Sequence, residues 1–420
     1  MTLILFTVQA VTQTFAEMEQ SQRLEKQAFS DYKAKSFAGF LAKTEKAKNL
    51  RPNHPRLIYN LSVAYALNGQ PAPALRELGK LARMGLYFQI DKDDDLGSLF
   101  ALDKFKSLMQ EFAENHKSIN RSSRAFTLPD KGLITEGIAF DPQTRSFFVS
   151  SVHQRKIVRV GENGKVTDFS AGSDGLWSVL GMKVDSKRRV LWVTSSAFPQ
   201  MRGFEKDQTG LAGIFKYDLE TGRLIKKYIL TNETEKHALG DLALDQRGGV
   251  YATDSIAPKI YQIKPENDEL EVFLESDSFS SLQGITFSKD YKELFIADYS
   301  KGIFKIDPTA KGITQLASDT AVTALGIDGL YAYNGDLIAI QNGVTPQRVV
   351  RLQLDKDQTR ITRLETLEAN HRDFNEPTLG VLTGNDFYYI ANSQWSLVNG
   401  NGELAEDRLQ VPVILRLGLN

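Results

Sequence analysis

The 420-residue sequence contains no cysteine, and it carries almost no net charge. Without cysteine the chain has no disulfide bonds, no thiolate catalysis and no cysteine-based zinc site. The formal charge of −1 leaves no basic excess of the kind that phosphate-rich partners require. We therefore expect neither nucleic acid nor an anionic membrane surface as a partner.

The sequence also lacks a long apolar run at its start. Residues 3–8 are apolar, but a helix that crosses a bilayer needs about 20 such residues. Residues 1–16 resemble the hydrophobic part and cleavage site of a secretory signal, without the basic residues that usually precede it. We expect either a truncated signal, and hence a periplasmic or secreted protein, or the first turns of a helix in a cytoplasmic one.

What the sequence does contain is a repeated pair of strands. The clearest copy spans residues 281–298, with a strand at 284–287, a polar turn and a return strand at 294–297. Five further copies begin at Glu136, Leu180, Gly240, Asp328 and Pro377. Six copies at intervals of roughly 45–60 residues predict a six-bladed β-propeller over residues 126–420. Residues 124–128 are predicted to add an outer strand to the last blade, beside residues 411–417.

Residues 17–115 have helical rather than strand periodicity. Residues 57–67 and 72–84 resemble a tetratricopeptide helical hairpin, with partner helices at 36–50 and 99–112. We therefore predict a mainly β protein preceded by a small all-α domain, with residues 116–125 as the linker. Such a domain either docks a protein or peptide partner or covers the propeller as a cap.

Oxygen-bearing side chains gather at one face of the predicted propeller. Each inner strand starts at the central channel, and each second strand returns there. The start positions are Glu136, Leu180, Gly240 with Asp241, Gln283, Asp328 and Pro377, and the return positions are Ser151, Ser195, Asp254, Asp298, Asn342 and Asn392. Carboxylates brought together repel one another unless a cation neutralises them, and such ligands suit calcium, magnesium or manganese. Asp254 and Asp298 are alternatively explained as residues that cap turns.

The strands 135–141, 283–288 and 328–330 resemble the metal-site strands of the gluconolactonase, regucalcin and luciferin-regenerating-enzyme superfamily. The resemblance implies one divalent cation, most simply calcium, held by Glu136, Gln283 and Asp328, with Asp241 assisting. It also implies a lactone or ester as substrate. Residue 283 is Gln where the family has Asn, and Gly240 stands where the family has a second Asn.

Other side chains are predicted at the same face. His237 and His153 are candidate general bases because they flank strand ends at the channel. Arg155, Trp177, Arg348 and Asn342 are candidate substrate-binding residues. The sequence thus predicts either a metal-dependent hydrolase of lactones or esters or a propeller that binds a ligand or protein without turnover, since one fold serves both uses.

Overall fold

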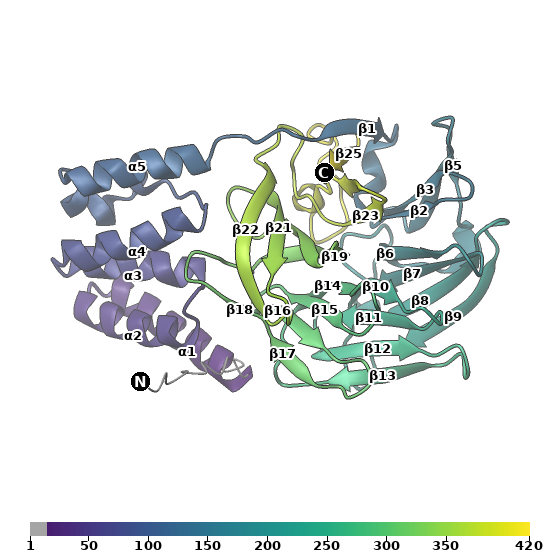
Figure 1. The fold of residues 1–420 in the computed structure, drawn as a ribbon, viewed down its shortest axis with the longest axis horizontal. Helices are drawn as coiled ribbons and strands as arrows, with labels where there is room; N and C mark the ends of the chain where they lie inside the picture. The colour runs from purple at the N-terminus through teal and green to yellow at the C-terminus, as the bar shows by residue number, and fades with distance from the viewer. Residues whose placement is uncertain (1–14) are drawn as a thin grey trace, which may run out of the picture.

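The computed structural model describes residues 15–420 and divides them into a helical segment and a six-bladed β-propeller (Figure 1). The helices pack side by side on one flank of the propeller. They are α1 (Phe15–Lys33), α2 (Phe37–Leu50), α3 (Pro55–Leu67), α4 (Pro71–Arg83) and α5 (Asp103–Asn115), with 3-10 turns η1 (Ile90–Lys92) and η2 (Asp94–Leu99) between α4 and α5. Of the predicted signal segment 1–16, residues 1–14 lie outside the described residues, so export stays a prediction. No helix within residues 15–420 is long and apolar enough to span a membrane.

Sequence signals explain where two of these helices begin. α3 and α4 each start at a proline, which suits the first helical position because its missing N–H has no partner there anyway. His54 precedes α3 and accepts a hydrogen bond from the amide of Leu57. The buried faces of the helices form one apolar core that includes Leu78 and Phe105.

Each blade is a four-stranded antiparallel sheet, and blade 5 has a short fifth strand. Blade 1 contains β2 (Thr135–Asp141), β3 (Ser146–Ser151), β4 (Lys156–Val160) and β5 (Val166–Asp168), and blade 2 contains β6 (Ser178–Asp185), β7 (Val190–Ser196), β8 (Ala212–Asp218) and β9 (Leu224–Leu230). Blade 3 contains β10 (Leu239–Leu244), β11 (Val250–Asp254), β12 (Lys259–Ile263) and β13 (Leu270–Glu275), and blade 4 contains β14 (Leu282–Phe287), β15 (Leu294–Asp298), β16 (Gly302–Ile306) and β17 (Ile313–Gln315). Blade 5 contains β18 (Ala317–Ser318), β19 (Ile327–Tyr333), β20 (Asp336–Gln341), β21 (Arg348–Leu354) and β22 (Arg360–Ala369), and blade 6 contains β23 (Gly380–Thr383), β24 (Asp386–Ile390) and β25 (Val413–Gly418) with β1 (Ser123–Thr127).

The last blade joins the two ends of the propeller, as the sequence predicted. β1 pairs antiparallel with β25 and forms the outermost strand of that sheet. Figure 1 shows the chain running from α5 across to β1. Sharing one sheet between the first and last strands closes the ring and removes an open edge.

The inner strands approach one another closely at a repeated irregularity. The inner strands of blades 1 to 5 are β2, β6, β10, β14 and β19. Near its channel end, each of them has a two-residue shift in its pairing with the next strand of the blade. All five have glycine within that shift: it is the second residue of the shift in four strands and the first, Gly240, in β10. A Cβ added at Gly284 would lie 2.5 Å from the carbonyl oxygen of Asp328, and one at Gly181 would lie 2.7 Å from the Cα of Asp241. Glycine is therefore required where neighbouring backbones touch around the channel.

Candidate functional site

Asp241 stands where the other four of these inner strands have glycine, and it carries a carboxylate into the ring. Its Oδ1 lies 2.9 Å from Nζ of Lys183 on β6. Its Oδ2 is buried and has no hydrogen-bond partner among the described residues. A buried carboxylate oxygen without a donor is costly, which is typical of a site that binds a ligand.

Glu136 is buried at the start of β2, and its carboxylate is held by the loop after β24. Oε2 accepts hydrogen bonds from Nε1 of Trp395 at 2.6 Å and from Oγ of Ser393 at 3.0 Å. Burial raises the pKa of Glu136 well above its ordinary value, and repulsion from Asp328 raises it further. These two hydrogen bonds lower the pKa but do not reverse the shift.

Asp328 starts β19 and is held by Asn342, the residue that follows β20. Nδ2 of Asn342 donates to Oδ2 of Asp328 at 2.8 Å and to the carbonyl oxygen of Pro377 at 3.0 Å. Oδ1 of Asn342 accepts a hydrogen bond from the hydroxyl of Tyr299 at 3.0 Å. Burial raises the pKa of Asp328 to about 7, and the negative charges of Asp241 and Glu376 add to the rise. The structure thus brings Asn342 to the predicted metal residue Asp328.

Gln283 starts β14 and extends toward blade 3. A Cβ added at Gly240 would lie 3.8 Å from Oε1 of Gln283, so the longer side chain points toward the space that residue 240 leaves empty. Its Nε2 donates to Oγ of Ser281 at 3.3 Å, which leaves Oε1 as the oxygen turned toward the ring. Gln283 therefore offers an amide oxygen next to the space that Gly240 leaves empty.

The oxygen atoms at the channel suit a hard cation, although few of them are carboxylates. Within residues 15–420 no three Asp, Glu or His side chains converge closely enough to ligate one ion. Two buried carboxylates that repel each other, Glu136 and Asp328, and the amide oxygen of Gln283 remain as donors. Oxygen ligands of this kind fit calcium, and a cation would relieve the repulsion. Asp241 is already paired with Lys183.

The two candidate histidines are each fixed through Nδ1. Nδ1 of His237 lies 2.9 Å from Oδ2 of Asp254, and Nδ1 of His153 lies 2.8 Å from the carbonyl oxygen of Gln200. A proton on Nδ1 leaves Nε2 as the acceptor. Burial lowers the pKa of His153, so its ring is neutral near pH 7. The other oxygen of Asp254 accepts three backbone N–H groups, from Ala238, Ile256 and Ala257, so this residue caps a turn as well.

Three of the predicted substrate-binding residues lie apart from the acidic pair. Trp177 packs edge-on against Phe215 in the core between blades 1 and 2, at 6.2 Å between ring centroids. Arg155 donates from Nε to the carbonyl oxygen of Leu176 at 2.7 Å. Arg348 is buried and binds the helical segment, so its guanidinium is not free at the rim.

Sequence reasoning missed Trp395, Ser393 and Lys183. Trp395 and Ser393 follow the last return position, Asn392, and this placement was the available signal. Lys183 lies two residues after Gly181 inside an inner strand, where the pattern predicted only packing.

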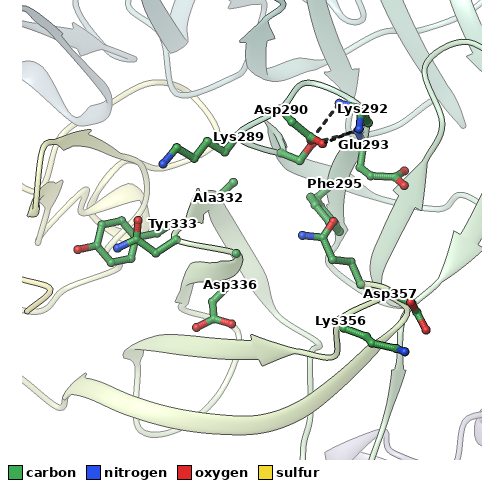
Figure 2. Close-up of a pocket in the computed structure, with 14 residues that line it drawn as sticks. Lys289, Asp290, Lys292, Glu293, Phe295, Ala332, Tyr333, Asp336, Lys356 and Asp357 are labelled. Atoms are coloured by element: carbon green, nitrogen blue, oxygen red, sulfur yellow. Dashed lines mark hydrogen bonds and ion pairs between the residues drawn. The ribbon is translucent and has the colours of Figure 1, made fainter.

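A hollow in the surface lies elsewhere, at the opposite ends of β14 and β19. It has a volume of about 710 Å³ and is lined by hairpin turns (Figure 2). Some of its charges are paired, as in Asp290 with Lys292 and Asp336 with Arg351. It holds no buried reactive group comparable to Glu136 or Asp328.

No protein-family profile matches the sequence, and the comparison with curated proteins gives no match. Solved structures with a similar fold include a gluconolactonase from Xanthomonas campestris, at 14% identity over 71% of this chain and 95% of that one, with a TM-score of 0.49. A luciferin-regenerating enzyme has 13% identity over 72% and 96%, with a TM-score of 0.49. Virginiamycin B lyase from Staphylococcus aureus has 14% identity over 72% and 100%, with a TM-score of 0.48. The chain is similar in fold to propellers of several activities, and these similarities assign none of them to it.

Proposed function

We propose that this protein is a metal-dependent hydrolase of lactones or esters that acts at the channel face of the propeller. The observation that carries the proposal is the pair of buried carboxylates, Glu136 and Asp328. Each is held by its own hydrogen bonds, and burial raises the pKa of each. A protein gains nothing in stability from two such acids. Buried acids that do not stabilise the fold are typical of functional sites.

Glu136, Asp328 and Gln283 would hold the cation, with calcium favoured and magnesium or manganese as alternatives. When bound, such an ion polarises a substrate carbonyl and acidifies water. Trp395 and Ser393 fix the direction of the Glu136 carboxylate, and Asn342 fixes that of Asp328. These neighbours keep the acids in place whether or not a substrate is present.

His237 is the candidate for proton transfer. Asp254 holds Nδ1 of the ring, which orients Nε2 as a proton acceptor. His153 has the same arrangement through the carbonyl oxygen of Gln200 and is the second candidate. His237→Gln distinguishes the two candidates. If His237 transfers the proton, this substitution changes the pH profile of kcat, and if His153 does, the profile stays the same.

A panel of γ-lactones, δ-lactones and aryl esters, assayed with and without calcium, tests the proposal. We expect calcium-dependent hydrolysis by the wild type and a loss of at least about 100-fold in kcat/KM for Glu136→Gln and for Asp328→Asn. Asp290→Asn, in the exposed hollow of Figure 2, is the matched control and should hydrolyse as the wild type does. No hydrolysis of any substrate would overturn the hydrolase, and hydrolysis that survives both acid replacements would overturn the site.

The second candidate is a propeller that binds a ligand in the channel without turnover. Lys183 and Asp241 favour it, because their ion pair places both charges in the ring and leaves Oδ2 of Asp241 open to a donor. A ligand that binds with the same affinity in the presence of calcium and of a chelator would support this alternative.

A further inference from the structure

The helical segment contains a pocket of its own, away from the propeller channel. It has a volume of about 200 Å³ and is bounded by α1, α2, α3 and the 3-10 turns before α5. The residues that matter for its chemistry are Phe29, Tyr32, Thr44, Tyr59, Asp93 and Asp95. A cavity of about 150 Å³ holds a benzene ring, so this pocket has room for one long side chain.

Two carboxylates give the pocket its charge. Oδ2 of Asp95 accepts a hydrogen bond from the hydroxyl of Tyr32 at 2.6 Å, and Oδ2 of Asp93 accepts one from the hydroxyl of Tyr59 at 2.6 Å. Neither aspartate takes part in an ion pair with another described residue. The hydrogen bond to Asp95 and burial raise the pKa of Tyr32 to about 12, so the tyrosine stays a neutral donor. Two negative charges therefore have no cationic partner among residues 15–420.

The wall beside these acids is aromatic. Phe29 is 55% exposed and stacks on Tyr32, with ring centroids 6.3 Å apart and planes 14° from parallel. This face already attracts a cation, because Nζ of Lys33 lies 4.5 Å from the centroid of the Phe29 ring, and a planar guanidinium stacks on such a face more closely than an ammonium group. A large apolar side chain exposed on a helix at the mouth of an acidic pocket is typical of a binding surface.

A third feature points to a ligand independently of the charges. Thr44 lines the same pocket and is only 2% exposed, and its Oγ1 has no hydrogen-bond partner in the described part of the chain. A buried hydroxyl in a helix ordinarily finds an acceptor nearby. An incoming donor group would satisfy it.

We propose that this pocket binds the side chain of an arginine presented by a partner peptide or protein. The guanidinium has five donors for the oxygens of Asp93, Asp95 and Thr44, and its plane matches the stacked rings of Phe29 and Tyr32. The pocket's third acid, Glu25, is already paired with Arg51 and is not needed. The assignment is independent of the channel chemistry, so either can fail alone.

Two small molecules test the assignment on the wild-type protein. N-acetylarginine amide and N-acetylcitrulline amide have nearly the same shape, but only the first is charged. Titration by saturation-transfer difference NMR should give saturable binding of the arginine compound and at least tenfold weaker binding of the citrulline compound. Equal affinity for the two, or no saturable binding of the arginine compound up to 20 mM, would overturn the proposal.

Variants then place the binding in the pocket. Asp93→Asn and Asp95→Asn should each raise the Kd of the arginine compound at least threefold, and asparagine at 93 can still cap η2 through its side-chain oxygen. Asp91→Asn is the control, because Asp91 is exposed and pairs with Lys92 outside the pocket. An unchanged Kd in both pocket variants, with unchanged far-UV circular dichroism, would contradict the assignment.

Discussion

Arg348 joins the propeller to the helical segment. Its Nε donates to Oε1 of Gln341 at 2.7 Å, and its Nη1 donates to the carbonyl oxygen of Met84, just after α4, at 3.0 Å. Gln341 immediately precedes Asn342, whose amide holds Asp328. Arg348 thus links the helical segment to Gln341 at the end of β20, and the next residue, Asn342, holds Asp328.

Replacement of Arg348 by methionine should destabilise the protein by roughly 2–6 kcal/mol. The variant keeps a long apolar stem but leaves Gln341 and the carbonyl group of Met84 without their buried donor, at a cost of about 1–3 kcal/mol each. Burial lowers the pKa of Arg348 to about 10, so the arginine is still charged near neutral pH. Differential scanning calorimetry at pH 7.5 measures the loss.

Arg416→Met is the control for that measurement. Arg416 pairs with Asp386 at 2.8 Å, and its side chain is about half exposed. An exposed ion pair contributes about 1 kcal/mol or less to the free energy of unfolding. The melting temperature of Arg416→Met should therefore stay close to that of the wild type. Equal losses in the two variants would show that Arg348 does not stabilise the joint.

The cation-free protein should lose stability as the pH rises from about 4 to 7. Asp328 has a pKa raised to about 7 in the folded state against an ordinary value of 3.8, so across this window the folded protein binds a proton that the unfolded chain has released. Unfolding is therefore favoured as the pH rises, by roughly 2–4 kcal/mol in total.

Urea unfolding in a chelator at several pH values measures this slope. Asp328→Asn carries no titrating group at the position and should reduce the slope between pH 4 and 7, which leaves the part contributed by Glu136, whose pKa is also raised. A wild-type slope equal to that of the asparagine variant would mean that Asp328 is not a protonated acid in the folded protein.

Asp241→Asn should lower the pKa of Asp328, because the negative charge of Asp241 is one of the causes that raise it. The stability loss should then begin at the same pH, which the unfolded chain sets, but end at a lower pH and be smaller than in the wild type. The same urea series checks this, and a shift to higher pH would contradict the electrostatic account.

Trp395 should report the state of the channel. Its Nε1 donates to Glu136, so a cation at that carboxylate changes the field at the indole. We expect calcium to change the tryptophan emission of the wild type and of Trp177→Phe, but not that of Trp395→Phe. A response that disappears with Trp177 instead would locate the cation outside the predicted site.

The propeller could be predicted because its signal repeats. Six strand pairs with the same alternation report the same buried environment, and the joining of the first and last strands follows from the need to close the ring. The helices of the flank could also be predicted, because residues 57–67 and 72–84 have helical periodicity. Both features depend on the spacing of apolar residues within short segments, and this spacing can be read directly from the sequence.

The site was less predictable, because its partners come from distant loops. Glu136 and Asp328 could be placed at the channel by their position in the repeat, whereas Trp395 reaches Glu136 from a loop 259 residues later in the chain. Arg348 also looked like a rim residue, but the helical segment covers it. Which side chain a loop or a neighbouring domain buries depends on tertiary packing that no short pattern records.

The most direct test of the account is a calorimetric titration of calcium chloride into chelator-treated protein at pH 7.5. We predict one saturable site in the wild type, at least tenfold weaker binding in Glu136→Gln and in Asp328→Asn, and unchanged binding in Asp290→Asn. No saturable heat for calcium, magnesium or manganese in the wild type, or unchanged calcium affinity in both acid variants, would contradict the metal site on which the proposed hydrolase depends.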